Sequence, residues 1–361
     1  MAKKLAFDKL LFTAVMLLVG FGLVMVYSAS AAIARESGAA LNPFLVKQAA
    51  AAALGLALMA LVMHLDYRAL RRPAVIYGML LAVLALLVAA LFAPALNQTH
   101  RWVFVGGVSL QPSELAKLVL VAFLAYQIDR KADRVNQPEL LIPALAVTGL
   151  LAGLVLLEPH LSAALVLGAC CCLLLFLAGF SWRWMAIGAA VVAPVVAAAV
   201  WLVPYRRERF LTFLDPERDP LGSGFQVMQS LIAVGSGGVF GLGLGNGAQK
   251  LYFLPYPHTD FIFAIVAEEL GLLGALLVLA LFVVVGWRGV RAGLAAPDDF
   301  GRYLAWGLTG VLVLQALLHA SVAVALIPST GIPMPFMTYG GSALVAALVA
   351  SGMILNVSQH G

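Results

Sequence analysis

Charged side chains are scarce in this chain. Only 11% of its residues are Asp, Glu, Lys or Arg, whereas 63% are hydrophobic. Soluble globular domains carry about 25% charged residues, which supply the polar surface that covers their core. The scarcity of charge therefore excludes an ordinary soluble domain and predicts an integral membrane protein.

Sequence signatures of several enzyme classes are also missing. The chain has no G-x-x-x-x-G-K-[ST] loop, no H-E-x-x-H and no G-x-S-x-G, which disfavours ATP-driven transport, zinc proteolysis and standard serine hydrolysis. Cys170, Cys171 and Cys172 are consecutive, without the spacing of a zinc site, so we expect them to face lipid or the core. The basic residues form no stripe interleaved with aromatics, and the net charge of +5 does not predict a nucleic-acid partner.

Long apolar runs, by contrast, recur from one end of the sequence to the other. Runs of about 18 to 25 residues are long enough to cross a hydrocarbon core ~30 Å thick. They predict an all-α polytopic membrane protein with one membrane domain over residues 1–361. The ten transmembrane helices are expected at 10–33, 44–64, 74–94, 113–127, 140–157, 162–181, 185–204, 260–286, 302–327 and 337–356. The first run is longer than the apolar part of a signal peptide, so we interpret it as a retained span.

Basic residues concentrate on one side of these spans. With the N-terminus inside, the cytoplasmic segments hold Lys3, Lys4, Lys9, Arg68, Arg71, Arg72, Arg130, Lys131, Arg134, Arg183, Arg288, Arg291 and Arg302. The short outer loops hold only Arg35 and Arg101. The positive-inside rule therefore predicts that both termini are cytoplasmic.

One long loop, residues 205–259, separates the seventh span from the eighth and is predicted to be extracytoplasmic. It contains seven glycines between Gly235 and Gly247, which argue against a regular helix crossing the membrane there. We expect a short interfacial helix followed by a tight glycine-rich turn, whose backbone must be satisfied by protein or water.

Three carboxylates lie at or inside the eighth apolar run. Asp260 is predicted at the outer surface, at the positive end of a helix dipole, with Thr259 as the helix N-cap. Glu268 and Glu269 lie deeper in the same run. They are either structural carboxylates bonded to a neighbouring helix or members of a relay in a transporter. Asp260 differs from both because water can reach it.

Candidate binding residues gather on the same predicted face as Asp260. Outer arginines either contact lipid headgroups or bind phosphate through paired hydrogen bonds. Lys117 and Glu114 are three residues apart, so they form a structural ion pair or else Lys117 binds an anionic substrate. His258 is expected to orient its loop. The full set of candidate substrate-binding residues is Arg101, Glu114, Lys117, Arg206, Arg207, Arg209, His258 and Thr259.

Five segments, in order along nearly the entire chain, resemble the SEDS family of shape, elongation, division and sporulation proteins. They read FGLVMVYSAS, HRWVFVGGVSLQPSELAKL, YRRERFLTFLDPERDPLGSGFQVMQSLIAVGSGGVFGLGLG, HTDFIFAIVAEELG and PSTGIPMPFMTYGGSALV. The compact glycine turn GLGLGNGAQKLYFLP is more similar to the FtsW branch of the family than to the RodA branch.

The resemblance implies a ten-span peptidoglycan glycosyltransferase that polymerises lipid II on the outer face of the bacterial cytoplasmic membrane. It also implies a class B penicillin-binding protein as the cross-linking partner, together with other membrane proteins of the division or elongation machinery. The essential aspartate of the family's H-T-D motif falls on Asp260. A divalent cation such as Mg²⁺ or Mn²⁺ can share the task of neutralising pyrophosphate, but the sequence contains no recognisable ligand set.

Two departures from the family pattern limit what the resemblance carries over. Pro255 is followed by Tyr256 and Pro257, where the family usually has a glutamate close to this proline. The common Q-P-D after the fifth span is replaced by Glu158, Pro159 and His160. Two other readings stay open: a lipid II flippase that uses Glu268, Glu269 and Lys117, and a non-enzymatic scaffold for the transpeptidase.

Overall fold

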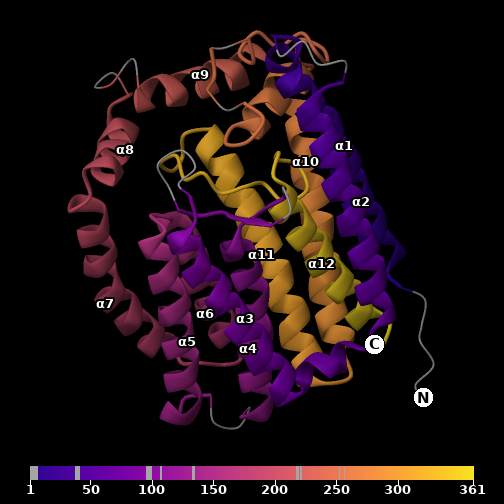
Figure 1. The fold of residues 1–361 in the computed structure, drawn as a ribbon, viewed down its shortest axis with the longest axis vertical. Helices are drawn as coiled ribbons and strands as arrows, with labels where there is room; N and C mark the ends of the chain where they lie inside the picture. Colours follow the sequence, from indigo (N-terminus) through magenta and orange to yellow (C-terminus); the bar gives the residue numbers. More distant parts are fainter. Residues whose placement is uncertain are drawn as a thin grey trace.

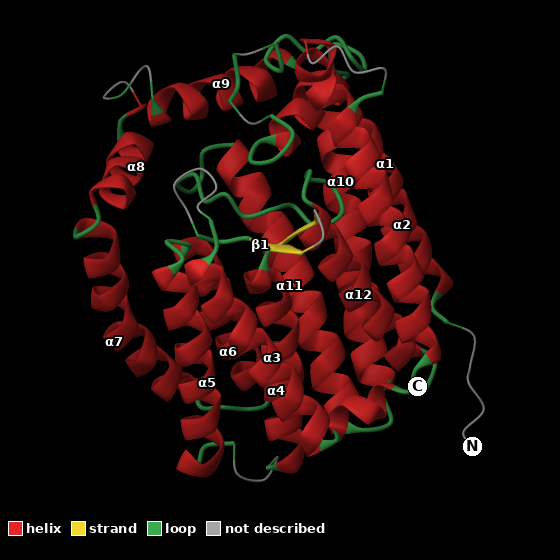
Figure 2. Ribbon diagram, viewed as in Figure 1, coloured by secondary structure: helices red, strands yellow, loops and turns green. Residues whose placement is uncertain are grey.

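The chain is almost entirely helical (Figure 2). The computed structural model describes residues 7–36, 41–94, 100–105, 108–131, 135–216, 219, 222–251, 253–255 and 257–361. Lys3, Lys4, Arg134 and Tyr256, which enter the predictions above, lie outside these residues. The all-α membrane fold is confirmed.

Twelve α-helices, one 3-10 helix and one β-hairpin occur in the described residues. They are α1 (Lys9–Glu36), α2 (Pro43–His64), η1 (Tyr67–Arg71), α3 (Pro73–Phe92), β1 (Val103–Val105), β2 (Val108–Leu110), α4 (Pro112–Arg130), α5 (Pro138–Leu157), α6 (Leu161–Leu177), α7 (Trp182–Trp201), α8 (Pro204–Leu214), α9 (Ser223–Ser236), α10 (Ile262–Ala295), α11 (Asp299–Ala323) and α12 (Gly341–Ser358). The helices α2, α3, α4, α5 and α8 begin at a proline, whose fixed φ suits the first helical position. The two strands pair antiparallel, with Phe104 opposite Ser109.

Each of the ten predicted spans overlaps one of these helices. Eight are long and apolar enough to cross a membrane: α1, α2, α3, α5, α7, α10, α11 and α12. The two exceptions have simple causes. Helix α6 has only 17 residues, and α4 carries charged residues near both of its ends, among them Glu114 and Asp129. The exact number of ten crossings stays a prediction.

The centre of the bundle is formed by α4, α10, α11 and α12, with α1 and α2 on one side and α3, α5 and α6 on the other (Figure 1). Helices α2 and α12 pack closely enough to require glycine at their contact. A Cβ on Gly352 would lie 2.9 Å from the Met59 carbonyl oxygen. Helix α7 lies at the edge of the bundle and has no buried residue; α7, α8 and α9 form an arch around the rest of the molecule (Figure 1).

The two ends of the bundle are distinguishable by their contacts. The described residues near the two chain ends lie at one of them, because the Asp8 amide donates to Ser358 Oγ at 3.3 Å. The Arg288 guanidinium also pairs with Asp8, so α10 finishes near this end. We call it the termini face. Residue Ile262, where α10 begins, therefore lies at the opposite end, which we call the α8 face.

The segment 205–259 contains α8 and α9 followed by the predicted glycine-rich turn. The turn is held against α10 by backbone hydrogen bonds: the Leu242 and Gly243 amides donate to the Glu268 and Glu269 carbonyls at 3.0 and 2.9 Å. These carbonyls are available because α10 is interrupted at Gly271, where φ is 65°. Protein groups thus satisfy much of the glycine-rich backbone, as the prediction required.

Thr259 is not the N-cap of the eighth span, and that prediction was wrong. Helix α10 begins at Ile262 and its N-cap position is Phe261, with no side-chain hydrogen bond to the helix. Residues 257–261 form turns instead, which places Thr259 and Asp260 in the loop before the helix.

Candidate active site

Asp260 lies two residues before α10 at the α8 face and is partly exposed. The Thr259 side chain hydrogen-bonds to the Asp260 carboxylate. Across from it runs the loop between α11 and α12, where a Cβ on Gly331 would lie 3.9 Å from Asp260 Oδ2. Gly331 has a φ of 65°, a conformation that favours glycine and lets this loop lie close to the carboxylate.

Two of the predicted arginines act on Asp260. Arg209 comes from α8; its Nη1 donates to the Ser329 carbonyl at 3.2 Å, and its guanidinium lies 4.7 Å from the centre of the Tyr205 ring. Arg101 precedes β1, and its Nε and Nη2 donate to the Glu158 and Pro159 carbonyls at 3.1 and 2.5 Å. Both cations are thus fixed by neutral carbonyls, and neither forms a contact ion pair with a carboxylate of the described residues.

Burial and charge compete at Asp260. Burial raises the pKa of its carboxyl above the usual range, while Arg209 and then Arg101 act in the opposite direction. At Arg101 burial again disfavours the charged form, so it lowers the pKa of the guanidinium. Nearby Tyr205, Glu158 and Asp260 partly offset this effect. The result is a carboxylate that accepts a proton more readily than an exposed aspartate, beside two cations suited to an anionic substrate.

Glu158 and His160 form a second buried group beside Arg101. Both Glu158 carboxylate oxygens and His160 Nε2 lack a hydrogen-bond partner in the described part of the chain. Burial raises the pKa of Glu158 to about 8, opposed by Arg101. The pKa of His160 falls to about 3, mainly through burial and further through Arg101 and Lys117. Between them Pro159 has a φ of 29°, far from the value near −65° that its ring favours, so this turn is strained.

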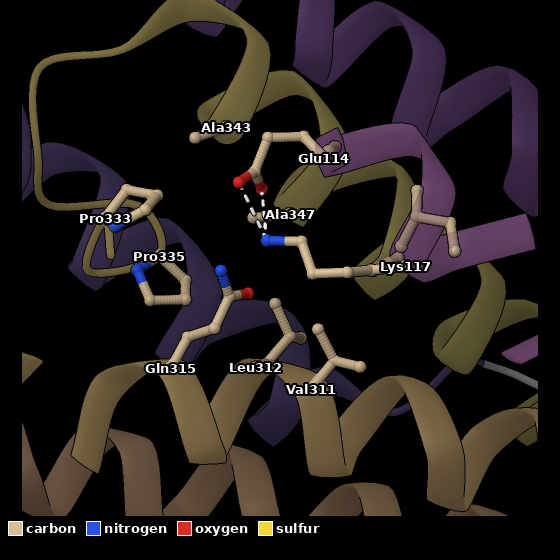
Figure 3. Close-up of a pocket in the computed structure, with 12 residues that line it drawn as sticks. Glu114, Lys117, Val311, Leu312, Gln315, Pro333, Pro335, Ala343 and Ala347 are labelled. Carbon is tan, nitrogen blue, oxygen red and sulfur yellow. Dashed lines mark hydrogen bonds and ion pairs between the residues drawn. The ribbon is translucent and has the colours of Figure 1, made fainter. Parts of the chain in front are cut away.

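Lys117 and Glu114 form an ion pair, which is one of the two readings of their spacing. Lys117 Nζ donates to both Glu114 carboxylate oxygens at 2.7 Å, and both residues are buried. Figure 3 shows the pair facing Gln315 of α11 and the two prolines of the α11–α12 loop. The cavity between them measures only about 10 Å³, room for roughly one water molecule. A substrate role for Lys117 stays a prediction.

The other predicted residues occupy different surroundings. Arg206 Nη1 donates to the Ala199 carbonyl at 3.1 Å, near the end of α7, and Arg207 is exposed. The His258 ring packs against Phe44 and Tyr339, with ring centres 4.8 and 5.5 Å apart. Burial lowers the pKa of His258 to about 4. This neutral, packed imidazole fits the predicted role of orienting the loop, and its substrate role stays a prediction.

Sequence reasoning gave no role to the α11–α12 loop, although it forms one wall of the site. The Ser329 carbonyl binds Arg209, and Ser162 Oγ of α6 donates to the Thr330 carbonyl at 2.9 Å. The His319 ring approaches the Ile332 carbonyl at 2.9 Å. The proline-rich pattern PSTGIPMP was the available signal, because such a rigid segment presents free carbonyls to its neighbours.

Glu268 and Glu269 serve a different purpose from Asp260. The Glu269 carboxylate accepts hydrogen bonds from Lys250 Nζ, Ser28 Oγ and the Gly245 amide at 2.5 to 2.9 Å. Glu268 Oε1 accepts from the Ala248 and Gln249 amides at 2.7 and 3.0 Å. Both side chains fasten the glycine-rich turn to α10. Glu269 also bonds to Ser28 of α1, so the predicted structural bond to a neighbouring helix is confirmed for Glu269. Glu268 bonds to the turn, and its Oε2 is buried without a hydrogen-bond partner in the described residues.

No group of three or more His, Cys, Asp and Glu side chains in the described residues is arranged to hold a metal ion. The surroundings of Asp260 contribute guanidinium groups rather than further carboxylates, a donor set that does not suit a divalent cation. The three cysteines are free thiols.

The family model described as "Cell cycle protein", which covers FtsW, RodA and SpoVE, matches residues 8–361. The chain belongs to this family. A probable peptidoglycan glycosyltransferase FtsW from Geobacter metallireducens is 40% identical over 94% of this chain and 91% of its own length. Stage V sporulation protein E from Bacillus subtilis is 38% identical over 99% of this chain and 98% of its own.

Solved structures of the family share the fold. One, from a study of how a peptidoglycan synthase complex coordinates polymerization and crosslinking, matches with a TM-score of 0.82 and 35% identity over 98% of both chains. The rod shape determining protein RodA of Thermus thermophilus matches with a TM-score of 0.71 and 30% identity over 98% of this chain and 97% of its own. Such agreement over nearly full length confirms the polytopic fold of the family.

Proposed function

We propose that this protein is a peptidoglycan glycosyltransferase that polymerises lipid II into β-1,4-linked glycan strands. Relatives of this name are about 40% identical over most of the chain. The observation that carries the proposal is the state of Asp260: partly exposed, with a raised pKa, and acted on by Arg209 and Arg101. A base beside two available cations suits a reaction that deprotonates a hydroxyl and releases a phosphate.

In the proposed mechanism, Asp260 removes the proton from the 4-hydroxyl of the acceptor sugar as that oxygen attacks the anomeric carbon of the donor. A sugar hydroxyl is too weak an acid to ionise at neutral pH, so a positioned base with a raised pKa is effective. The anomeric carbon inverts, the bond to the lipid pyrophosphate breaks, and the proton stays on Asp260. The leaving group departs as an anion and needs no strong general acid.

Arg101 and Arg209 are proposed to bind the pyrophosphate. Their anchoring by the Glu158, Pro159 and Ser329 carbonyls holds the positive charge in place without neutralising it, so little reorganisation is needed when the anion forms. A divalent cation can assist when bound to the pyrophosphate, but no protein ligand set for it is part of this proposal.

The α8 face is proposed to be extracytoplasmic. The support is the concentration of arginines at the termini face, which includes Arg68, Arg71 and Arg130, in accordance with the positive-inside rule. To test this, Arg207→Cys in a background without the three native cysteines is treated with a membrane-impermeant maleimide on intact cells. Labelling only after cell lysis would contradict the orientation.

A class B penicillin-binding protein is the proposed partner, because a similar structure belongs to a complex that couples polymerization to crosslinking. A role in division, as in the FtsW branch, is proposed over a role in elongation, since the FtsW-named relatives reach 40 to 42% identity.

Polymerisation of lipid II by the purified protein, with and without the partner, tests the function. Glycan polymer on a gel, formed by the wild type and absent with Asp260→Asn, is the expected result. Movement of lipid II across vesicle membranes without polymer would instead indicate a flippase. Neither activity, with the partner's crosslinking enhanced, would indicate a scaffold. The flippase reading is weakened by the structural bonds of Glu268, Glu269 and Lys117.

A further inference from the structure

A second, much larger cavity lies at the termini face, away from Asp260. It measures about 750 Å³, opens at the surface and is lined by residues of α3, α4 and α5, which pack against one another. This volume is within the range of small-molecule sites. Its position at the termini face follows from the Arg71–Asp129 ion pair at 2.7 Å, which joins the end of α4 to η1, and from η1 itself, whose Tyr67 amide donates to Asn356 near the C-terminus.

The lining changes from charged to apolar along α4. Arg130 and Lys131 stand at its end, whereas Phe123 lies seven residues earlier, about 10 Å deeper at ~1.5 Å per residue. Tyr77 of α3 makes edge contacts with Phe123 and Tyr126, with ring centres 6.4 and 6.3 Å apart. On the other side Val147 of α5 completes the apolar part.

The two cations at the mouth are held by neutral groups. Arg130 Nη1 donates to the Tyr126 hydroxyl at 2.7 Å, and its guanidinium lies 5.5 Å from the centre of that ring. Lys131 Nζ donates to the Glu139 carbonyl at 2.5 Å. That carbonyl is available because Pro143, four residues on, has no N–H to bond it within α5. Both cations are thereby positioned without an ion pair in the described residues.

The charge at the mouth favours an anion. Among the described residues, two carboxylates line the cavity, Asp129 and Glu139. Asp129 pairs with Arg71, which is not part of the lining. With Asp129 so neutralised, the described lining residues Arg130 and Lys131 outnumber Glu139 by one positive charge.

We propose that this cavity binds an anionic phospholipid of the cytoplasmic leaflet, with the phosphate on Arg130 and Lys131 and an acyl chain against Phe123, Tyr77 and Val147. A soluble anion would use the cations but leave the apolar depth unfilled, and a neutral lipid would use the depth but not the cations. Basic pockets between transmembrane helices on this side of a membrane suit such headgroups. The site is separate from the proposed glycosyltransferase chemistry.

Binding is measured by native mass spectrometry of the purified protein in detergent, titrated with phosphatidylglycerol or phosphatidylcholine. The wild type is expected to bind one phosphatidylglycerol in preference to phosphatidylcholine. R130Q/K131Q should weaken phosphatidylglycerol binding by about tenfold or more. The control R183Q/R291Q removes the same charge from arginines that do not line the cavity and should bind as the wild type does.

A second pair of variants tests the depth of the cavity without changing charge. Val147→Trp blocks part of the apolar depth and should weaken the preferred adduct, while Ile142→Trp, at an exposed position of the same helix, should not. Equal adducts of both lipids in every variant would overturn the proposal and indicate surface lipid only. Competition by inorganic phosphate as strong as by the lipid would overturn it in favour of a soluble anion site. If Val147→Trp does not fold, the charge pair decides alone.

Discussion

Asp260 and the pair Glu268 and Glu269 lie within ten residues of one another, yet their surroundings differ in kind. Glu269 is fully buried and accepts bonds from a lysine, a hydroxyl and an amide. Asp260 is partly exposed, and the arginines that act on it are bonded to carbonyls elsewhere. A buried carboxylate that bonds to the segments around it, as Glu269 does, serves the fold, whereas a partly exposed one beside cations that are held by other groups can serve a reaction.

The largest change in activity is expected from Asp260→Asn. Loss of a general base reduces the rate by about 10²- to 10⁴-fold, so lipid II polymerisation should fall by this amount. The stability of the fold should not decrease. Because burial raises the pKa of Asp260, its ionised form is unfavourable in the folded state, and a neutral amide removes that penalty at neutral pH. The unfolding midpoint in detergent should equal or exceed that of the wild type, and a clear decrease would assign Asp260 to the fold instead.

Lys250→Met should instead lower the stability of the fold. It leaves Glu269 buried without its cation, and breaking such a pair costs about 3–5 kcal/mol. The expected result is a large drop in the unfolding midpoint. Lys47→Met, at an exposed lysine, is the matched control and should melt as the wild type does. A double variant, Lys250→Met with Glu269→Leu, should recover part of the loss; no recovery would mean that the pair is not the source of the stability.

Glu158→Gln tests a third kind of carboxyl. Glu158 is buried like Glu269, but its carboxylate oxygens have no hydrogen-bond partner in the described residues. The folded-state pKa of Glu158 is about 8, against an ordinary value of 4.5, so between these values the folded state holds a proton that the unfolded state has released. Wild-type stability should therefore decrease as the pH rises from about 4.5 to about 8. The glutamine variant lacks this decrease, so its stability advantage over the wild type should grow steadily over that range. Parallel stability curves for the two proteins would contradict the assignment.

Much of this comparison could be predicted from the sequence, because it depends on local pattern. Apolar run lengths located a helix at every predicted span, and the spacing of Glu114 and Lys117 offered their ion pair as one of two readings. Asp260 emerged as a carboxylate at the edge of an apolar run. Each inference used residues close together in the chain, where helix geometry fixes the relation between side chains.

The remainder depends on contacts between residues far apart in the sequence. Ser28 meets Glu269 across 241 positions, and Arg209 meets Ser329 across 120; no local periodicity reports either contact. The break of α10 at Gly271 was missed because a glycine inside an apolar run looks like an ordinary helical residue. Thr259 was assigned as an N-cap by its residue type, whereas the turns of residues 257–261 delay the helix to Ile262.

The smallest effect is expected from Arg209→Lys, which keeps the positive charge but changes how it is held. Lysine cannot reproduce the planar contact with Tyr205, and its single ammonium group is less fixed by the Ser329 carbonyl. The cation near Asp260 is then less well positioned, and we expect kcat/KM for lipid II to fall by about tenfold. Arg207→Lys, on the same helix but exposed, should leave kcat/KM unchanged. A larger loss of kcat/KM in Arg207→Lys than in Arg209→Lys would assign the pyrophosphate contact to Arg207. It would also show that the position of an arginine on α8, and not its anchoring by the α11–α12 loop, determines which one binds.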